Sequence, residues 1–162
     1  MSWTDRKAVE NIIYFRDKYD FRAFIETGTF KGIYAEFMSK HFESVMTCEV
    51  NEEYFKQSLK RLMNITNVSM FRGDSSLFLR SIKPELEKCI VYLDAHFYDS
   101  TRKNKFVVLD ELKALKNTPN IILIIHDFDN NLGHITYDGQ NLNLKLMEKD
   151  LIKVNPDFCL YT

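Results

Sequence analysis

The stretch Phe24-Ile25-Glu26-Thr27-Gly28-Thr29-Phe30-Lys31-Gly32 decides how this chain folds. An apolar, β-prone run enters it and a helical pattern leaves it. A strand, a glycine turn and a helix in that order form an anion or nucleotide site, because backbone N–H groups at the helix N-terminus point at the ligand. The spacing is Gly-x-x-x-Gly rather than G-x-G-x-x-G. Glu26 closes the strand, and a carboxylate there favours a cationic ligand over a phosphate.

A second acid, Glu49, closes the next apolar run, Val45-Met46-Thr47-Cys48-Glu49. In doubly wound folds an acid about twenty residues beyond the glycine turn binds the ribose hydroxyls of the nucleotide. The third apolar run ends at Gly73-Asp74-Ser75. Three polar sites in this order therefore predict a nucleotide-like ligand at the ends of successive strands.

The length of 162 residues fits one domain with a single core. A formal net charge of −1 excludes a whole-chain electrostatic footprint for nucleic acid or an anionic membrane. The N-terminus lacks the apolar region of a signal peptide, and no apolar run is long enough to span a membrane. Cys48, Cys89 and Cys159 lie in strand-like runs and form no CxxC pair. We therefore expect a cytoplasmic protein with buried free thiols.

Strand and helix patterns alternate along the whole chain. The strands are predicted at about 21–26, 44–49, 68–71, 89–94, 121–125 and 158–161. Helices are predicted at about 5–18, 32–41, 52–63, 105–117 and 142–152, with a further helix capped by Asp74 or Ser75. This alternation predicts an α/β, Rossmann-like doubly wound fold, with a mostly parallel sheet and helices on both faces. Acids or glycine end the first five strands, where ligands bind in such sheets: Glu26, Glu49, Gly73-Asp74, Asp94 and Asp127.

Taken together, Glu26 with Gly28 and Gly32, then Glu49, then Gly73-Asp74-Ser75, resemble the class I S-adenosylmethionine-dependent methyltransferases. Leu93-Asp94-Ala95-His96, Leu109-Asp110-Glu111-Leu112 and Ile125-His126-Asp127-Phe128 are similar to a bacterial subgroup of macrocin and catechol O-methyltransferase type. The resemblance covers about residues 20–160. It implies methyl transfer to a small hydroxylated acceptor, such as a sugar or a natural product. It also implies S-adenosylmethionine at Glu26, Thr27, Gly28, Thr29, Gly32, Glu49, Val50, Gly73, Asp74, Ser75 and Asp94.

On this resemblance, residues 1–162 form one domain. A leading helix occupies 1–19, a donor-binding half 20–83 and an acceptor-side half 84–162. The family fold usually finishes with a sixth strand and an antiparallel seventh, whereas this sequence stops at Thr162, directly after the predicted sixth strand. The seventh strand is then absent, supplied by another subunit, or lost by truncation. The exposed edge of a sixth strand predicts a homo-oligomer.

Methyl transfer needs an in-line approach of the acceptor and removal of its proton. Among the histidines near the strand ends, His96 is the preferred base and His126 the second candidate, with Asp94 beside them. The resemblance also implies a divalent metal at Asp94 and Asp127. His126 at a neighbouring position would suit Mn²⁺, Fe²⁺ or Zn²⁺ better than Mg²⁺. A metal-assisted reaction and a histidine-catalysed one both stay open.

Two other functions compete with methyl transfer. A methyltransferase-like domain could bind S-adenosylmethionine or a protein partner without turnover, which the apparently shortened C-terminus favours. A nicotinamide-dependent oxidoreductase is disfavoured, because the G-x-G-x-x-G spacing is missing.

Overall fold

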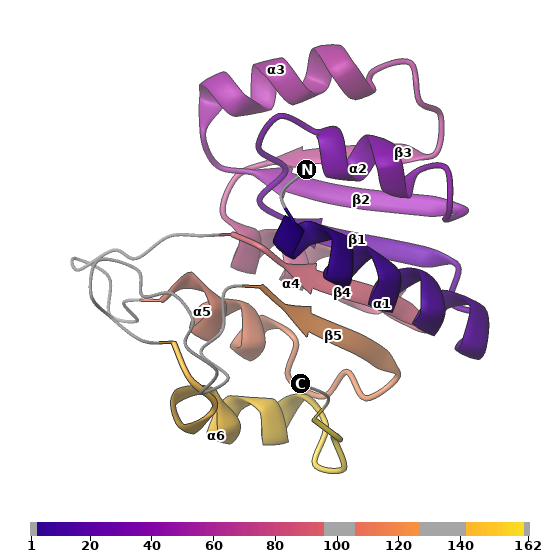
Figure 1. Ribbon diagram of the computed structural model, residues 1–162. Coiled ribbons are helices and arrows are strands. Elements are labelled where there is room, and N and C mark those ends of the chain that lie inside the picture. The colour runs from indigo at the N-terminus through magenta and orange to yellow at the C-terminus, as the bar shows by residue number, and fades with distance from the viewer. Residues whose placement is uncertain (1–2, 96–105, 127–141, 161–162) are drawn as a thin grey trace.

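A parallel sheet of five strands, in the order β3-β2-β1-β4-β5, forms the centre of the computed structural model. The structure describes residues 3–95, 106–126 and 142–160 (Figure 1). The strands are β1 (Ala23–Thr27), β2 (Ser44–Glu49), β3 (Val68–Arg72), β4 (Cys89–Leu93) and β5 (Ile121–Ile125). The predicted doubly wound fold is confirmed.

The strand order places a switch point between β1 and β4. The chain runs from β1 outward to β2 and β3, then returns to the other side of β1 for β4 and β5. Every residue of β4 is buried, as its unbroken apolar run Cys89–Leu93 predicts for a strand covered on both faces. Ligands in open α/β sheets bind outside the carboxyl ends of the strands at such a switch point. The fold therefore directs attention to the ends of β1 and β4.

Helices cover both faces of the sheet. One face packs against α1 (Trp3–Tyr19), α2 (Ile33–Met38) and α3 (Glu52–Leu62), through a core that includes Ile12, Met38 and Leu62. The other face packs against α4 (Ser75–Ile82), α5 (Val107–Ala114) and α6 (Leu144–Val154), and a 3₁₀ turn, η1 (Lys83–Glu85), follows α4. The side chains of Asn51 and Asp74 cap α3 and α4 by accepting hydrogen bonds from backbone N–H groups, and the cap at Asp74 was predicted.

The predicted sixth strand is wrong for the part that the structure describes. Residues 158–160 have no strand conformation. Directly after α6, Asn155 accepts a hydrogen bond from the Phe158 backbone at its carbonyl and one from the Asp157 backbone at its side chain. This turn sends Phe158 back onto the core instead of alongside β5. Within the described residues there is no sixth-strand edge, and self-association stays a prediction.

The cysteines are not all buried. Cys48 and Cys89 are buried and free, as predicted, whereas Cys159 is free and exposed, because the segment after α6 is not a strand. Within the described ranges, no helix has the length and apolarity required to cross a bilayer.

Candidate active site

The glycine turn after β1 presses against the end of β4. Gly28 has φ of 83°, and a Cβ built there would lie 2.6 Å from the Asp94 carbonyl oxygen. The turn is also tied to β2, because Gly28 N and Thr29 N both donate to the Cys48 carbonyl at 3.0 Å. These two N–H groups are thus bonded within the protein. The expectation about the helix N-terminus concerns α2, which begins at Ile33, and stays a prediction. The N–H groups of Gly28 and Thr29 hold the turn in place against β2.

The Glu49 carboxylate at the end of β2 is fixed by two backbone donors. Phe30 N donates to Oε2 and Asn51 N donates to Oε1, each at 2.8 Å. Each carboxylate oxygen keeps a further lone pair for another donor. Glu49 is 7% exposed. It is held ready to accept two hydroxyl groups, which is the chemistry expected of a ribose-binding acid.

Glu26, at the end of β1, is buried beside two threonines. The Thr47 hydroxyl donates to Glu26 Oε2 at 2.6 Å, and the Thr29 hydroxyl lies 2.6 Å from the Thr47 hydroxyl. Burial raises the pKa of Glu26 to about 8, the Thr47 hydrogen bond lowers it, and nearby Asp94 and Glu49 raise it further. Thr47 was missed at the sequence level. A polar residue at an inward position of an apolar strand is the signal that could have found it.

Asp94 and His126 meet at the ends of β4 and β5. His126 Nδ1 lies 3.0 Å from Asp94 Oδ1, and the side chains are 17% and 25% exposed. The backbone N–H of Asp94 donates to the Thr27 hydroxyl, and the backbone N–H of His126 donates to the Leu93 carbonyl. A carboxylate on Nδ1 fixes the orientation of the imidazole ring, whose two nitrogens can each exchange a proton near neutral pH.

A second buried acid, Glu111 on α5, lies on the opposite face of the sheet from Glu26. Glu111 is 1% exposed, and burial raises its pKa to about 7. Hydrogen bonds from the Ser75 and Thr27 hydroxyls lower this pKa, whereas Asp74 and Asp94 raise it. Glu111 was given no role from the sequence. Its place in the inward stripe of α5, three positions after Val108 and one before Leu112, is the signal that was overlooked.

The third strand end contributes a helix cap. Asp74 Oδ1 accepts hydrogen bonds from Ser76 N at 2.9 Å and Leu77 N at 3.2 Å, so this oxygen is engaged in starting α4. Ser75 is buried, and Gly73 has φ of 151° where the chain leaves β3. Asp74 and Ser75 thus lie at the start of α4 and act on the Glu111 carboxyl group, whose pKa Asp74 raises and Ser75 lowers.

Two predicted site residues, His96 and Asp127, fall outside the described part of the chain. The preferred base and the second metal ligand are therefore not placed. Within the described residues, no three His, Cys, Asp or Glu side chains come together in a way that could hold a metal ion. Of the two histidine candidates, the structure places His126 and pairs it with Asp94.

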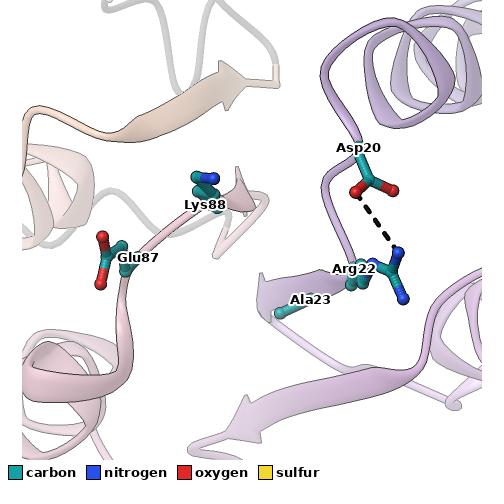
Figure 2. Close-up of a pocket in the computed structure, with 5 residues that line it drawn as sticks. All are labelled: Asp20, Arg22, Ala23, Glu87 and Lys88. Atoms are coloured by element: carbon teal, nitrogen blue, oxygen red, sulfur yellow. Dashed lines mark hydrogen bonds and ion pairs between the residues drawn. The ribbon is translucent and has the colours of Figure 1, made fainter.

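A surface hollow lies at the opposite edge of the sheet, where β1 and β4 begin. Figure 2 shows its lining residues, which are Asp20, Arg22, Ala23, Glu87 and Lys88. Arg22 is paired with Asp20 at 3.3 Å and with Glu43 at 2.6 Å. These charged side chains are exposed to solvent, where ion pairs are weak. The hollow is remote from the acids at the carboxyl ends of the strands and is separate from the candidate site.

Comparisons with solved structures agree with this geometry. A S-adenosylmethionine-dependent methyltransferase from Anabaena variabilis matches 99% of this chain and 74% of its own, with TM-score 0.63 and 16% identity. The N-terminal domain of EvdMO1, solved with S-adenosylhomocysteine bound, has TM-score 0.58 and 14% identity over 90% of this chain and 69% of its own. CalS10, an amino pentose methyltransferase from Micromonospora echinaspora, has TM-score 0.55 and 18% identity over 79% of this chain.

These likenesses establish the class of fold, which is that of the S-adenosylmethionine-dependent methyltransferases. This chain spans about half of CalS10, 52% of its length. No protein-family model and no curated protein sequence matches it. Within the methyltransferase fold, the macrocin and catechol subgroup remains a resemblance of sequence segments.

Proposed function

We propose that the chain is a S-adenosylmethionine-dependent methyltransferase acting on a small hydroxylated acceptor. The observation that carries the proposal is the Glu49 carboxylate, fixed by the Phe30 and Asn51 backbone N–H groups at 2.8 Å, at the end of β2 in a methyltransferase fold. A carboxylate already oriented for two hydroxyl donors fits the ribose of the donor. S-adenosylmethionine supplies, when bound, a methyl group on a positively charged sulfur.

Residues around Glu49 fit the rest of the donor. Val50 is 71% exposed and Phe30 is 49% exposed, although both are apolar. The Phe30 ring contacts the Tyr54 ring with centroids 4.4 Å apart. These surfaces border the carboxylate and offer apolar contact to a nucleoside base. On the other side of the turn, the acids Glu26 and Asp94 favour the positively charged end of the donor.

The Asp94 and His126 pair fits the acceptor half of the reaction. A carboxylate that holds Nδ1 fixes the ring orientation and stabilises the charged imidazolium that forms when Nε2 takes a proton. His126 would remove the acceptor hydroxyl proton while the bound donor is attacked in line. His96 lies outside the described residues and is the second candidate for the same step. A divalent metal would need Asp127, which also lies outside them.

The acceptor class rests on two observations. Asp94 lies beside His126 at the strand ends, and a histidine held by a carboxylate suits proton removal from a hydroxyl group. CalS10, whose fold this chain shares, is an amino pentose methyltransferase. A sugar or a sugar-bearing natural product is therefore the acceptor class to test first.

The proposal is tested in two stages on the same protein sample. Titration calorimetry with S-adenosylmethionine, S-adenosylhomocysteine and NAD should give binding of the first two only. Donor consumption is then followed against a panel of sugars and phenols, with and without a chelator. Failure of S-adenosylmethionine to bind would refute the proposal. Binding without turnover on any acceptor would instead favour a donor-binding domain without catalysis.

A further inference from the structure

Three buried side chains form a chain of hydrogen bonds beneath the glycine turn. Glu26 on β1 and Thr47 on β2 are direct partners in the parallel register, and Thr29 comes from the turn itself. The Thr47 hydroxyl lies 2.6 Å from Glu26 Oε2 and 2.6 Å from the Thr29 hydroxyl. Glu26, Thr47 and Thr29 are 1%, 0% and 3% exposed. Water therefore has little access to these three side chains, and they hydrogen-bond to one another.

The hydrogen bonds among Glu26, Thr47 and Thr29 have two possible arrangements, which differ in the charge on Glu26. A charged Glu26 has no hydrogen, so Thr47 donates to it and must accept from Thr29. Both hydroxyl dipoles then point toward the carboxylate and stabilise its charge. A protonated Glu26 can donate to Thr47, which then donates to Thr29. The direction of the Thr47–Thr29 hydrogen bond thus follows the charge on Glu26.

The surroundings of Glu26 favour its protonated form in the unliganded protein. Burial raises its pKa to about 8, and Asp94 on β4 and Glu49 on β2 add to the effect. Tyr92 is its register partner on β4, Tyr34 of α2 stacks on Tyr92, and His126 is held by Asp94 at the end of β5. A positive ligand group bound over the turn would favour the charged form.

We propose that Thr47 is a positioning residue that makes donor binding proton-linked. By donating to Glu26, Thr47 stabilises the carboxylate that the cationic donor needs. As the ammonium group of the donor binds, the Glu26 proton leaves to solvent and the Thr47–Thr29 hydrogen bond turns toward Glu26. This inference rests on the proposed function, because it takes the donor to bind at this turn. The one covalent bond that breaks is the O–H bond of the Glu26 carboxyl group, whose proton passes to water or buffer. The positive charge of the ligand ammonium group replaces the charge of that proton.

The linkage fixes the sign of the pH dependence. Below about pH 8 each binding event must first remove a proton from Glu26, so donor affinity rises with pH by up to about tenfold per unit and levels off above that value. At pH 7 close to one proton should be released per donor bound. Loss of the Thr47 hydroxyl raises the Glu26 pKa further, so affinity at pH 7 falls and its rise moves to higher pH.

The test is titration calorimetry in phosphate and in Tris, whose different ionisation enthalpies reveal the number of protons released. The probes are S-adenosylhomocysteine, which has the ammonium group, and 5′-methylthioadenosine, which lacks the amino-acid end. Wild type should release close to one proton with the first and none with the second. Thr47→Val should weaken S-adenosylhomocysteine about 10- to 100-fold at pH 7. Thr47→Ser, which keeps a hydroxyl, should restore affinity and pH profile.

Thr118→Val is the matched control. Thr118 is also buried, and its hydroxyl has no hydrogen-bond partner among the described residues. The Thr118→Val protein should bind both probes with the affinity of wild type. Above pH 8 the ammonium group of the probe itself begins to lose its proton. This loss is the same for every variant, so the effect of Thr47 is read from the difference between variants.

The outcomes separate the two proposals. If neither probe binds wild type, the proposed function fails and this inference with it. If S-adenosylhomocysteine binds without proton release, or if Thr47→Val matches wild type, the inference alone is overturned. A measurement without ligand tests the inference even if Thr47→Val folds poorly. The infrared band of the protonated Glu26 carboxyl group should be present at pH 7 in wild type and in Thr47→Ser. The band is identified by its loss in Glu26→Gln. Its absence in wild type would also overturn the inference.

Discussion

His126 Nδ1 lies 3.0 Å from Asp94 Oδ1, which joins the ends of the neighbouring strands β5 and β4. The two residues are thirty-two positions apart in sequence and come from different strands. Their contact fixes the orientation of the imidazole ring at the ends of these two strands. The pair is the described group best suited to remove a proton from an acceptor.

Replacing His126 should therefore abolish most turnover. We expect His126→Gln to lower the turnover number about 10²–10⁴-fold, with donor affinity little changed, because general-base catalysis contributes about that much. Asp94→Asn should cost less, since it leaves the base in place but removes the charge that orients it. Donor consumption at saturating acceptor measures both.

His41→Gln serves as the control, because His41 lies beyond the end of α2, away from these strand ends. A His126→Gln protein with normal turnover would contradict the assignment. A large loss in His96→Ala under the same assay would then transfer the role to His96. Loss of wild-type turnover on chelation would indicate the metal-assisted reaction.

Replacing Glu49 tests the ribose contact. In Glu49→Gln one end of the side chain becomes an NH₂ group, which cannot accept from both the Phe30 and the Asn51 N–H. We expect donor affinity to fall about 10- to 100-fold or more and the free energy of unfolding to fall by about 1–3 kcal/mol. Glu148→Gln, on the exposed side of α6, should change neither quantity. Unchanged donor affinity measured by calorimetry would rule out the ribose contact.

The glycine turn should tolerate no side chain at Gly28. With φ of 83° and the Asp94 carbonyl oxygen 2.6 Å from the added Cβ, the obstruction at Gly28 is backbone and cannot move aside. Gly32 also has positive φ, 74°, but its added Cβ meets the Leu62 and Ser58 side chains at 3.1 Å. Gly28→Ala should thus lower the free energy of unfolding by more than about 2 kcal/mol, and by more than Gly32→Ala does. Equal losses in urea denaturation would contradict this ranking.

The two buried acids should make the unliganded protein less stable as pH rises. Both pKa values are raised from 4.5, that of Glu26 to about 8 and that of Glu111 to about 7. The folded protein then holds protons that the unfolded chain has lost, so stability decreases above about pH 4.5 and levels off above the folded pKa values. Glu26→Gln and Glu111→Gln remove this loss. Each should be more stable than wild type at pH 8.5, by up to a few kcal/mol, with a smaller difference at pH 5.

Urea denaturation at pH 5 and pH 8.5 provides the measurement, and Glu148→Gln again provides a matched control. The advantage of Glu111→Gln should be complete by about pH 7, whereas that of Glu26→Gln should grow until about pH 8. A Glu26→Gln advantage that is the same at both pH values would show that the acid is not protonated in the folded state.

Much of the site could be predicted because the carboxyl ends of parallel strands meet at one edge of a sheet. Glu26, Glu49 and Asp94 each follow an apolar run, so placing the runs as strands also placed the acids. The sixth strand failed for a reason that pattern alone does not carry. Phe158 packs on the core after a turn at Asn155. In the sequence, an apolar residue that packs after a turn cannot be told from one in a strand.

The sequence by itself determined the order of strands and helices, the doubly wound class and the acids that end the strands, since these depend on local periodicity and capping. Only the tertiary structure decided which groups interact: the Cys48 carbonyl that uses the turn N–H groups, Thr47 beneath Glu26, and His126 against Asp94. Such contacts depend on the register of neighbouring strands and on burial. Both are set by how distant segments pack, and burial is also what raises the pKa of Glu26.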